Sequence, residues 1–415
     1  MANTENTKAF YGAAIPSDWE VVPLEKVVLK PIVYGIVQAG PEIENGVHYI
    51  KSTDVGGEII VNKLSKTSKE IAAKYNRSEV FPGDIVFSLR GNIGELSIVP
   101  EELPVANLTQ GTARISVDKS RFSSNFIKYV LHSTTVFKNI IQVSKGSTFS
   151  EISLGELRNI ELPIPPLSEQ RAIAQVLSQM DRAINTHNQL IAQKELRKKW
   201  LMQELLTGKK RLKGFEGVWK EATLGKLFDR VTRKNSEVNT NVVTISAQRG
   251  FVKQTDFFNK SIASEVLDNY FLVRKGEFCY NKSYSNGYPW GATKRLNDFE
   301  KAVVTTLYIC FGIKDDSMTN GNFFEQYFEA NFLDRGLTKI AHEGGRAHGL
   351  LNVTPSDFFS LKITIPSFDE QTAISQVLQT ADKEIQLLKA KRERLKEQKK
   401  GMMQVLLTGK KRLKI

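Results

Sequence analysis

The feature that most constrains this sequence is an internal repeat. Residues 162–213 and residues 363–414 align without a gap at an offset of 201 residues, and 24 of the 52 aligned positions are identical. Both copies carry a proline-containing run before the dipeptide Glu-Gln and end in LLTGKKRLK. A gapless match of this length indicates a tandem duplication. The chain is therefore predicted to consist of two units, each a variable region followed by a repeated segment.

Each repeated segment is predicted to form one long helix. Pro165 and Pro366 end an extended stretch, and Ser168 or Asp369 then stands where an N-cap is expected. A glutamate follows each of these two residues, in the first turn, where the helix dipole favours negative charge. Apolar residues recur at helical spacing up to the glycine after Leu-Leu-Thr, which is a typical helix stop. Each helix should have about 38 residues and measure about 60 Å.

The apolar stripe also predicts how the two helices pack. The second helix can bury its stripe most directly by running back along the first, so we expect an antiparallel coiled coil with pseudo-twofold symmetry. Trp19 near the N-terminus stands in for Trp219, which follows the first helix, and this cyclic pattern predicts that the C-terminus lies near the first variable region. The expected helix–helix contact residues are Ile173, Leu177, Met180 and Ile184 in the first helix and Ile374, Leu378, Ala381, Ile385 and Leu388 in the second.

The two variable regions have the pattern of mixed α/β (α+β) domains. Strand-like runs such as DIVFSL and VVTTLYICFG are interspersed with short helical stretches such as SNFIKYVLHS. Outside the segments that lead into them, the two regions are hardly alike. Matched helices that carry unlike domains favour a ligand with two unlike halves. The expected boundaries are residues 1–161 for the first domain, 162–213 for the first helix, 214–362 for the second domain and 363–415 for the second helix.

The charge of the chain indicates an anionic partner. The sequence has 58 Lys and Arg against 45 Asp and Glu, a formal charge of +13. Such an excess is typical of nucleic-acid-binding proteins, although ribosome-associated and membrane-surface proteins are also basic. No stretch approaches the roughly 18 apolar residues that a membrane span needs, and the N-terminal residues are polar, so a cytoplasmic location is expected. Cys279 and Cys310 lie in apolar runs and are expected to be buried thiols.

Several loops have the composition that a base-reading surface needs. Arg and Lys suit O6 and N7 of guanine, Asn and Gln suit N6 and N7 of adenine, and Ser, Thr and backbone amides suit phosphates. Each residue taken singly also fits an ordinary solvated loop, so the groups carry the prediction. The candidate DNA-binding residues are Ser88, Arg90, Asn92, Thr109, Gln110, Lys145, Ser147 and Thr148 in the first region, and Arg249, Lys282, Ser283, Tyr284, Asn286, Tyr288, Arg346 and His348 in the second.

The ends of both helices are strongly basic. Residues 194–213 contain eight Lys or Arg, and residues 389–414 contain eleven. A run of this kind is either a solvated helix face or a set of phosphate contacts beside a DNA-reading domain. The sequence leaves both interpretations open.

Motifs that would indicate an enzyme are missing. There is no GxxxxGK[ST] loop for nucleotide phosphates, and no Asn/Asp-Pro-Pro-aromatic run of an amino-methyltransferase, because the Pro-Pro pair at 165–166 is followed by leucine. His342 and Glu343 begin a zincin-like string, but His348 has the wrong spacing, so no metal site is predicted. Scattered carboxylates near lysines leave a nuclease as an alternative.

A protein-interaction scaffold is the alternative from another class, since long helices also bind protein partners. The basic charge and the Asn-, Ser- and Arg-rich loops count against it. Binding to DNA that weakens steeply with salt would distinguish the two.

The run IPPLSEQRAIAQVL, its second copy near residue 363 and the LLTGKKRLK endings resemble the specificity subunits of type I restriction–modification systems. The resemblance covers essentially the whole chain, as domain, helix, domain, helix. The second copy departs from the first where Ser367-Phe368 replaces Pro166-Leu167, and we expect this change to weaken the start of the second helix.

The resemblance implies a non-catalytic subunit in which each target-recognition domain reads one half of a bipartite, asymmetric site in double-stranded DNA. It implies two modification subunits, which bind S-adenosylmethionine and methylate adenine, and restriction subunits, which hydrolyse ATP and cut DNA. The helices would fix the gap between the half-sites and dock the modification subunits. No cofactor is expected on this chain itself.

Overall fold

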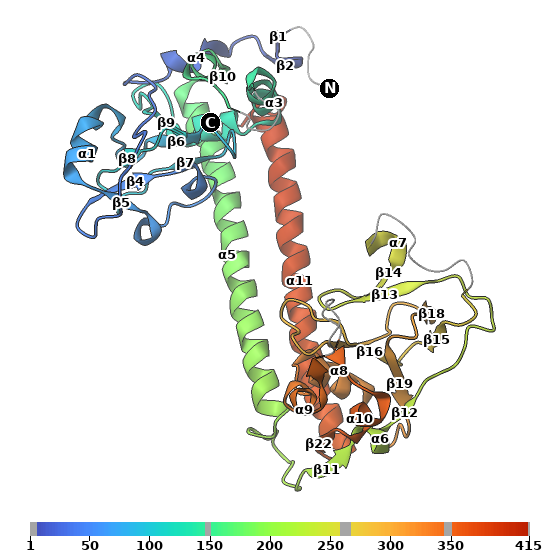
Figure 1. Cartoon of the computed structure of the whole chain (residues 1–415). Coiled ribbons are helices and arrows are strands. Elements are labelled where there is room, and N and C mark those ends of the chain that lie inside the picture. The colour runs from blue at the N-terminus through green and yellow to red at the C-terminus, as the bar shows by residue number, and fades with distance from the viewer. Residues whose placement is uncertain (1–5, 146–150, 258–266, 344–350, 414–415) are drawn as a thin grey trace. The chain divides into compact units, whose positions relative to one another are not determined.

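The computed structural model describes residues 6–145, 151–257, 267–343 and 351–413. The chain divides into two compact units, the first formed by residues 1–188 and 390–415 and the second by residues 189–389 (Figure 1). Two helices of 39 residues each have residues in both units: α5 (Leu167–Leu205) and α11 (Phe368–Leu406). The prediction of two long helices is confirmed, and each unit combines one domain with a part of both helices.

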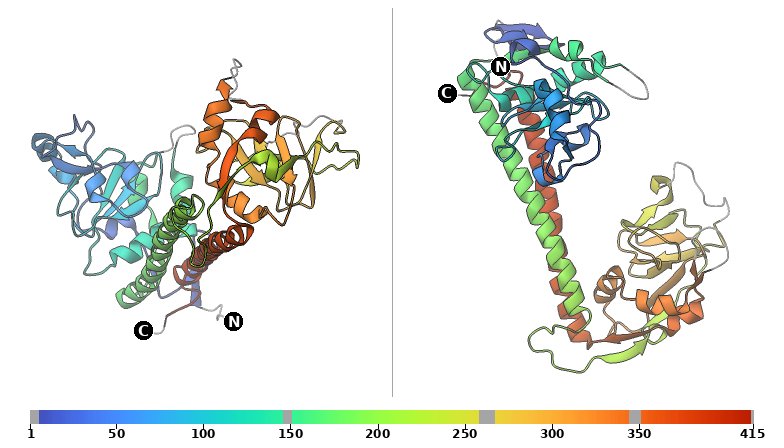
Figure 2. Two further views of the ribbon diagram at one scale, coloured as in Figure 1. Left: turned by 90° about the horizontal axis from the view of Figure 1, so that it is seen from below. Right: turned by 60° about the vertical axis from the view of Figure 1, so that its left-hand side comes forward.

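Within each unit the segments of α5 and α11 lie side by side and run in opposite directions (Figures 1 and 2). In the second unit, Glu195 of α5 pairs with Lys389 of α11 at 2.6 Å, and Lys198, further along α5, pairs with Asp382, earlier on α11, also at 2.6 Å. As the residue numbers increase along α5, the residue numbers of the partners on α11 therefore decrease. The expected antiparallel pairing is confirmed inside each unit.

The first domain is built from short strands around two small sheets. Its strands are β1 (Thr7–Phe10), β2 (Ala13–Pro16), β3 (Glu20–Pro23), β4 (Val47–Ile50), β5 (Lys66–Thr67), β6 (Ile85–Ser88), β7 (Leu96–Ile98), β8 (Asn107–Leu108), β9 (Thr112–Ile115) and β10 (Glu161–Ile164). Its helices are α1 (Lys69–Lys74), α2 (Ser124–Leu131), α3 (Thr134–Val143) and α4 (Leu154–Arg158). β6 lies between β7 and β9, both antiparallel, and β4 lies between antiparallel β5 and parallel β8.

The second domain is built around a four-stranded antiparallel sheet in the order β12-β19-β16-β17. Its strands are β11 (Lys220–Thr223), β12 (Phe228–Arg230), β13 (Val243–Ser246), β14 (Gly250–Lys253), β15 (Phe271–Arg274), β16 (Phe278–Asn281), β17 (Ala292–Arg295), β18 (Lys301–Val304), β19 (Ile309–Ile313), β20 (His342–Glu343), β21 (Leu351–Asn352) and β22 (Lys362–Ile365). Its helices are α6 (Leu224–Leu227), α7 (Gln254–Phe257), α8 (Gly321–Glu329), α9 (Asp334–Ile340) and α10 (Pro355–Ser360).

The two domains follow the same order of elements although their sequences are hardly alike. In each, a central strand (β6 or β16) pairs antiparallel with the next strand (β7 or β17) and with a later one (β9 or β19). A helix (α2 or α8) then follows, and an antiparallel pair (β3–β10 or β11–β22) joins the beginning of the domain to its end. The central strand is buried along its length in the first domain and over its first three residues in the second. The prediction of mixed α/β domains is confirmed.

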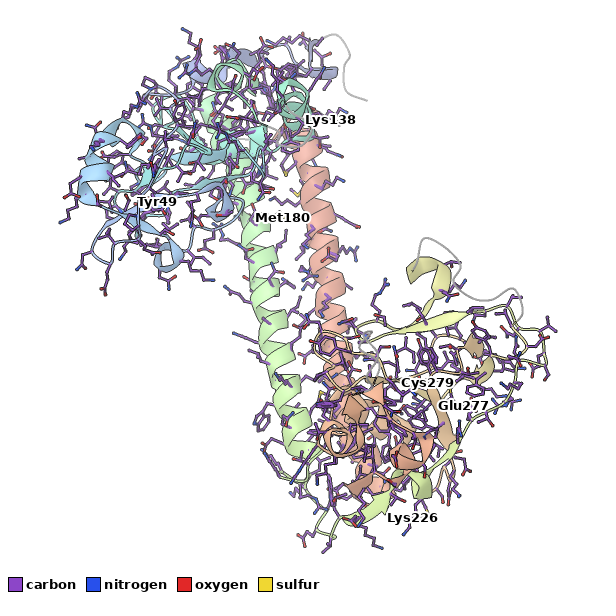
Figure 3. All side chains as sticks on the ribbon, viewed as in Figure 1. Tyr49, Lys138, Met180, Lys226, Glu277 and Cys279 are labelled. Carbon is purple, nitrogen blue, oxygen red and sulfur yellow. The ribbon has the colours of Figure 1, made fainter. Side chains whose placement is uncertain are left out.

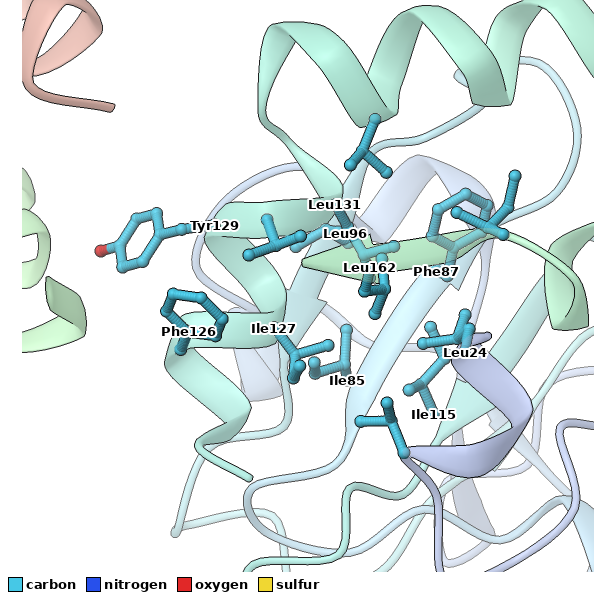
Figure 4. Close-up of a cluster of buried hydrophobic side chains, with 14 of the residues drawn as sticks. Leu24, Ile85, Phe87, Leu96, Ile115, Phe126, Ile127, Tyr129, Leu131 and Leu162 are labelled. Atoms are coloured by element: carbon cyan, nitrogen blue, oxygen red, sulfur yellow. The ribbon is translucent and has the colours of Figure 1, made fainter. Parts of the chain in front are cut away.

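The main core of each domain includes residues of both long helices. In the first unit, side chains of β6, β9 and α2 pack with Ile173 and Leu177 of α5 and with Leu406 of α11; Figure 4 shows the part of this cluster that lies within the domain. In the second unit, Ile374 and Leu378 join the aromatic core around β16 and β19. Each buried Leu or Ile contributes about 2 kcal/mol. The helices are therefore part of each domain's fold.

The residues predicted to line the helix–helix contact consequently fall into two sets. Those nearest the start of each helix are buried in the domain cores: Ile173, Leu177, Ile374 and Leu378. Further along the helices, Ile184 and Ile385 are buried, whereas Met180 (Figure 3), Ala381 and Leu388 are half-buried. The predicted stripe therefore also contributes to the domain cores, because a domain covers the first turns of each helix.

Both long helices begin one residue before the predicted N-cap, so Ser168 and Asp369 lie inside the first turn. The cap of α11 is Ser367, whose Oγ accepts the N–H of Glu370 at 3.4 Å. The same place before α5 holds Pro166, and proline suits a helix start because the N–H it lacks would have no partner there. The Ser367 substitution supplies a cap and does not remove one, contrary to the sequence-based expectation.

The two cysteines lie directly opposite each other on β16 and β19. Cys279 (Figure 3) and Cys310 are both buried free thiols, and their Sγ atoms are 3.2 Å apart. This agrees with the prediction of buried thiols. Within the described ranges, no helix is both long enough and apolar enough to cross a bilayer.

Candidate nucleic-acid interface

The buried glutamate of the repeated Glu-Gln dipeptide forms an ion pair that we term the clasp. In the first unit, Arg412 donates to Glu169 from Nε at 2.5 Å and from Nη2 at 2.6 Å, and its guanidinium lies 5.8 Å from the centre of the Trp19 ring. The Glu169 side chain is only 3% exposed, so the bidentate pair is shielded on its carboxylate side. The clasp joins the start of α5, the segment after α11 and the chain that leads into β3.

The second unit has the same clasp, in which the arginine and the glutamate are offset by 201 positions and the tryptophan by 200. Arg211 donates to Glu370 from Nε and Nη2, both at 2.6 Å, and lies 5.7 Å from the centre of the Trp219 ring. Trp219 also donates its Nε1–H to Glu370 at 3.2 Å, whereas the buried Nε1 of Trp19 has no hydrogen-bond partner among the described residues. These contacts agree with the cyclic arrangement predicted from the two tryptophans.

Glycine is required between the end of each long helix and the arginine of its clasp. Gly208 and Gly409 have φ of +70° and +67°, a left-handed conformation that ends a helix and that glycine adopts without strain. A Cβ on Gly409 would lie 2.3 Å from Cγ of Pro16. The predicted helix stops are confirmed, and they also let the chain approach the clasp closely.

The glutamine of the dipeptide holds each domain to its helix through backbone atoms alone. Gln170 and Gln371 each accept one backbone N–H and donate to two backbone carbonyls. The partners are Ser123 N at 3.0 Å, Arg121 O at 3.3 Å and Pro165 O at 2.9 Å for Gln170, and Asn320 N at 2.9 Å, Met318 O at 3.1 Å and Pro366 O at 3.1 Å for Gln371. Because no partner is a side chain, the contact tolerates a change of domain sequence.

A third repeated contact lies further along each helix. Asp181 of α5 accepts from the Tyr129 hydroxyl of α2 at 2.6 Å and pairs with Lys399 of α11 at 2.5 Å. Tyr129 belongs to the apolar cluster of Figure 4, with its hydroxyl end directed away from the other labelled side chains, and burial together with Asp181 raises its pKa, so its hydroxyl remains a donor. In the second unit the corresponding residues are Asp382, Gln326 and Lys198, with contacts of 2.9 Å to Gln326 and 2.6 Å to Lys198.

In the sequence, the charged residues and glutamines that the helix segments contribute to these contacts are identical in the two copies, whereas Tyr129 and Gln326 of the domains differ. The basic helix ends had two interpretations, a solvated face or phosphate contacts. Neither describes Lys198, Arg211, Lys399 and Arg412, because each pairs with a carboxylate of its own unit.

The three candidate loops of the first domain meet beyond the end of β6. Leu89 donates its N–H to Gly111 O at 2.8 Å and accepts from Ile152 N at 3.1 Å. Lys145 and Glu151 exchange backbone hydrogen bonds of 2.9 and 2.8 Å. Segments that are far apart in the sequence therefore form one surface. We term it the first loop cluster, composed of residues 89–95, 109–111, 145, 151 and 152.

The side chains of the first loop cluster differ in exposure. Arg90 and Asn92 are exposed, and Arg90 Nε lies 2.8 Å from a Glu151 carboxylate oxygen in a pair whose side chains are 45% and 42% exposed. Thr109 and Gln110 are half-buried. Exposed pairs of this kind contribute little to stability, so Arg90 can exchange its carboxylate for another acceptor at small cost.

Three candidates of the first domain need separate comment. Ser88 is fully buried, and its hydroxyl donates to Arg90 O at 3.1 Å, so it shapes the loop and the prediction that it contacts DNA is not supported. Lys145 is exposed and lies 3.5 Å from Glu156. Ser147 and Thr148 lie outside the described residues. An open hollow of about 570 Å³ beside Asn92 also contains Ile141 of α3, which the sequence did not single out.

The candidate loops of the second domain meet beyond the equivalent strand, β16. Lys282 O accepts from Leu351 N at 3.0 Å, as Leu89 O does from Ile152 in the first domain. Gln248, beside Arg249 in the β13–β14 turn, donates from Nε2 to Asn286 O at 3.1 Å. We term this surface the second loop cluster, composed of residues 248, 249, 282–288 and 351.

Its candidate side chains are again of several kinds. Tyr284, Asn286 and Arg249 are exposed, whereas Lys282 and Ser283 are half-buried, and burial lowers the pKa of Lys282. A hydrogen-bond acceptor on a ligand would stabilise the charged form of Lys282, which burial disfavours. Tyr288 is half-buried, and its hydroxyl donates a hydrogen bond to Glu329. Arg346 and His348 lie outside the described residues. Among the described residues, no three His, Cys, Asp or Glu side chains are grouped so that they could hold a metal ion.

His132 supports the first loop cluster and gives a pH-dependent prediction. Its Nε2 lies 3.1 Å from Gly94 O, and burial, with a smaller effect of Lys128, lowers its pKa to about 4 from an ordinary value near 6.5. The unfolded chain therefore binds this proton more tightly than the folded chain does. Stability from neutral His132 is complete above about pH 6.5, and about 3 kcal/mol of it is lost as the pH falls towards 4.

We expect the free energy of unfolding of the first unit, measured by denaturant titration, to show this slope between pH 6.5 and 4. In a His132→Gln variant the slope should be shallower by the same amount. His48, whose pKa burial also lowers, remains in both proteins and so cancels in the comparison. Equal slopes for the two proteins would contradict the assignment.

A family model described as the type I restriction modification DNA specificity domain matches residues 16–195 and 219–397. The EcoBI specificity subunit of Escherichia coli is 34% identical over 173 residues, which are 41% of this chain and 36% of that protein. The putative MjaX specificity subunit of Methanocaldococcus jannaschii is 27% identical over 444 residues, covering 99% of this chain and 97% of that protein. The solved type I S subunit from M. genitalium has the same fold, with a TM-score of 0.56 at 14% identity over 98% of both chains.

Two unlike domains, each tied by the same clasp to a shared pair of helices, define a modular two-site recognition protein. The chain belongs to the family of type I restriction–modification specificity subunits. It has two target-recognition domains that determine DNA specificity, and it is a non-catalytic component of its system. In this family S-adenosylmethionine and ATP bind the modification and restriction subunits. Membership decides against both the nuclease and the scaffold alternatives.

Proposed function

We propose that the first loop cluster reads one half of a bipartite, asymmetric DNA site and that the second loop cluster reads the other half. The observation that carries this proposal is the convergence of the candidate loops beyond the same strand of both domains, β6 and β16. Loops so placed are free to differ between the domains, while the strands and helices that support them keep one arrangement. Different side chains in one framework suit two different half-sites.

The exposed side chains of both clusters can form hydrogen bonds with the edges of bases. Arg90 can donate two hydrogen bonds to O6 and N7 of guanine, and Asn92 or Asn286 can bond to N6 and N7 of adenine. Lys145 and Lys282 suit phosphates, which position a protein on DNA but carry no sequence information directly. Because the exposed pair with Glu151 contributes little to stability, a guanine can take its place as the acceptor for Arg90 at small cost.

The proposal extends to the partners that the family implies. Two modification subunits would dock on the long helices and restriction subunits would join them, in the cytoplasm. Leu196, Trp200 and Leu387 on these helices are 68%, 48% and 63% exposed, and large exposed apolar side chains are typical of a surface that a partner covers. We further propose that α5 and α11 fix the number of base pairs between the half-sites.

Substitution of Arg90 tests the reading role. In the complex assembled with its modification subunits, we expect Arg90→Ala to reduce the preference for the cognate first half-site over single-base variants by about 5- to 150-fold, because one bidentate contact discriminates by about 1 to 3 kcal/mol. Preference at the second half-site should not change. The measurement is competition between DNA duplexes at fixed salt concentration.

Arg121→Ala is the matched control. Arg121 belongs to the same domain but not to the loop cluster. It contacts Gln170 through its backbone carbonyl, which the substitution keeps. The substitution therefore removes the same charge as Arg90→Ala and leaves the loop cluster unchanged. It should weaken all duplexes alike. If Arg90→Ala also weakened all duplexes alike, Arg90 would be a phosphate contact and its proposed reading role would be lost.

A further inference from the structure

The turn Ser285–Tyr288 of the second loop cluster forms hydrogen bonds with residues outside the cluster. Ser285 and Tyr288 exchange backbone hydrogen bonds of 3.2 and 2.8 Å. Gly287, at the third position, has φ of +80°, which a type II turn requires and glycine readily adopts. The turn places Asn286 at its exposed tip, and Tyr284, 64% exposed, just before it.

Tyr288 fixes the turn to the end of α8. Its hydroxyl donates to Glu329 Oε1 at 2.8 Å and accepts from Lys294 Nζ at 3.2 Å. Lys294, on β17, is 8% exposed, forms an ion pair with Glu329 and lies 4.7 Å from the centre of the Tyr288 ring. Burial, followed by Glu329, raises the pKa of Tyr288, so the hydroxyl keeps its proton and remains the donor.

A second, independent contact fixes the tip. Asn331 donates from Nδ2 to Gly287 O at 3.0 Å. Asn331 itself has φ of +58°, a left-handed conformation that asparagine tolerates better than most residues. The chain adopts it directly after α8, and there the amide lies within hydrogen-bond distance of the turn.

We propose that Tyr288, Glu329, Lys294 and Asn331 are positioning residues that set the base preference of the second half-site without contacting DNA. The proposal rests on the reading role of the second loop cluster. A turn that is fixed before binding presents Tyr284 and Asn286 in one geometry, and hydrogen bonds to base edges depend on that geometry. This anchor gives Tyr288 hydrogen-bond partners within its own domain, although it lies in a segment with the composition of a reading loop.

Two minimal variants test the anchor in the assembled complex. Tyr288→Phe removes only the hydroxyl, and Asn331→Gly removes the amide while it keeps the backbone free to adopt positive φ. For each, we expect the preference for the cognate second half-site over its single-base variants to fall about 5- to 10-fold, as the loss of about one hydrogen bond allows. Preference at the first half-site, measured in the same molecules, should stay within about twofold.

Two controls separate positioning from the alternatives. Val304→Ala shortens a buried side chain of β18 in another cluster of the same unit, so it lowers stability but should leave both preferences unchanged. Asn286→Ala removes a proposed contact directly. If it lowers second-site preference while Tyr288→Phe and Asn331→Gly do not, the positioning role is wrong and the reading role stands. If neither Asn286→Ala nor Tyr284→Ala has an effect, the reading role of this cluster is wrong.

Discussion

Replacing residues 220–365 with the corresponding segment of a relative that has a different target should change the second half of the methylated sequence completely and leave the first half unchanged. The segment begins with β11 and ends with β22, which pair antiparallel with Lys220 opposite Ile365. The chain therefore enters and leaves the domain at neighbouring points. Exchange at these points replaces the whole domain and leaves α5 and α11 intact.

The contacts that remain explain why the exchanged domain should fit. The clasp of the second unit, formed by Arg211, Trp219 and Glu370, lies outside the exchanged segment. Gln371 bonds only to backbone atoms, so any domain with the same backbone provides its partners. Asp382 loses Gln326 unless the incoming domain has a donor there, and we expect that loss to cost about 1 kcal/mol.

Methylated adenines mapped across a genome measure the outcome, and the reciprocal exchange of residues 20–164 provides the matched control. That exchange should alter the first half-site alone. A change in both halves after either exchange would show that the domains do not read independently.

The parts of the fold that were predictable from sequence are those that repeat. The duplicated segments carry a periodic apolar pattern over many turns, and such a pattern specifies a long helix whatever surrounds it. The glycine stops and the cyclic Trp19–Trp219 relation were predictable for the same reason. The pairing direction followed from the need to bury two equal stripes.

The polar contacts were not predictable, because they join residues that are far apart in the sequence. Glu169 was assigned to the helix dipole, whereas its partner is Arg412, 243 positions away. The burial of Ser88 also depends on neighbours that its own loop does not reveal. The composition of the loops indicated which residues could read bases, but Tyr288 shows that the same composition serves internal anchors.

A four-residue insertion made in both long helices should lengthen the gap between the half-sites by about 2 base pairs. The insertion adds about 6 Å to each helix at 1.5 Å per residue, and DNA rises about 3.4 Å per base pair. The boundary between the two units falls after Asn188 in α5 and after Lys389 in α11. Insertion at both points leaves every contact within each unit unchanged.

The same insertion in α5 alone is the informative control. The first unit fixes α5 against α11 through Asp181 and Lys399, and the second does so through Asp382 and Lys198. An extra turn in one helix cannot satisfy both ion pairs while both helices stay continuous. This variant should methylate sites of the original spacing at least about tenfold less, because breaking such a partly buried pair costs more than about 1.4 kcal/mol, and it should gain no defined new spacing. If the matched insertion left the spacing of methylated sites unchanged, α5 and α11 would hold the domains without measuring the distance between their targets.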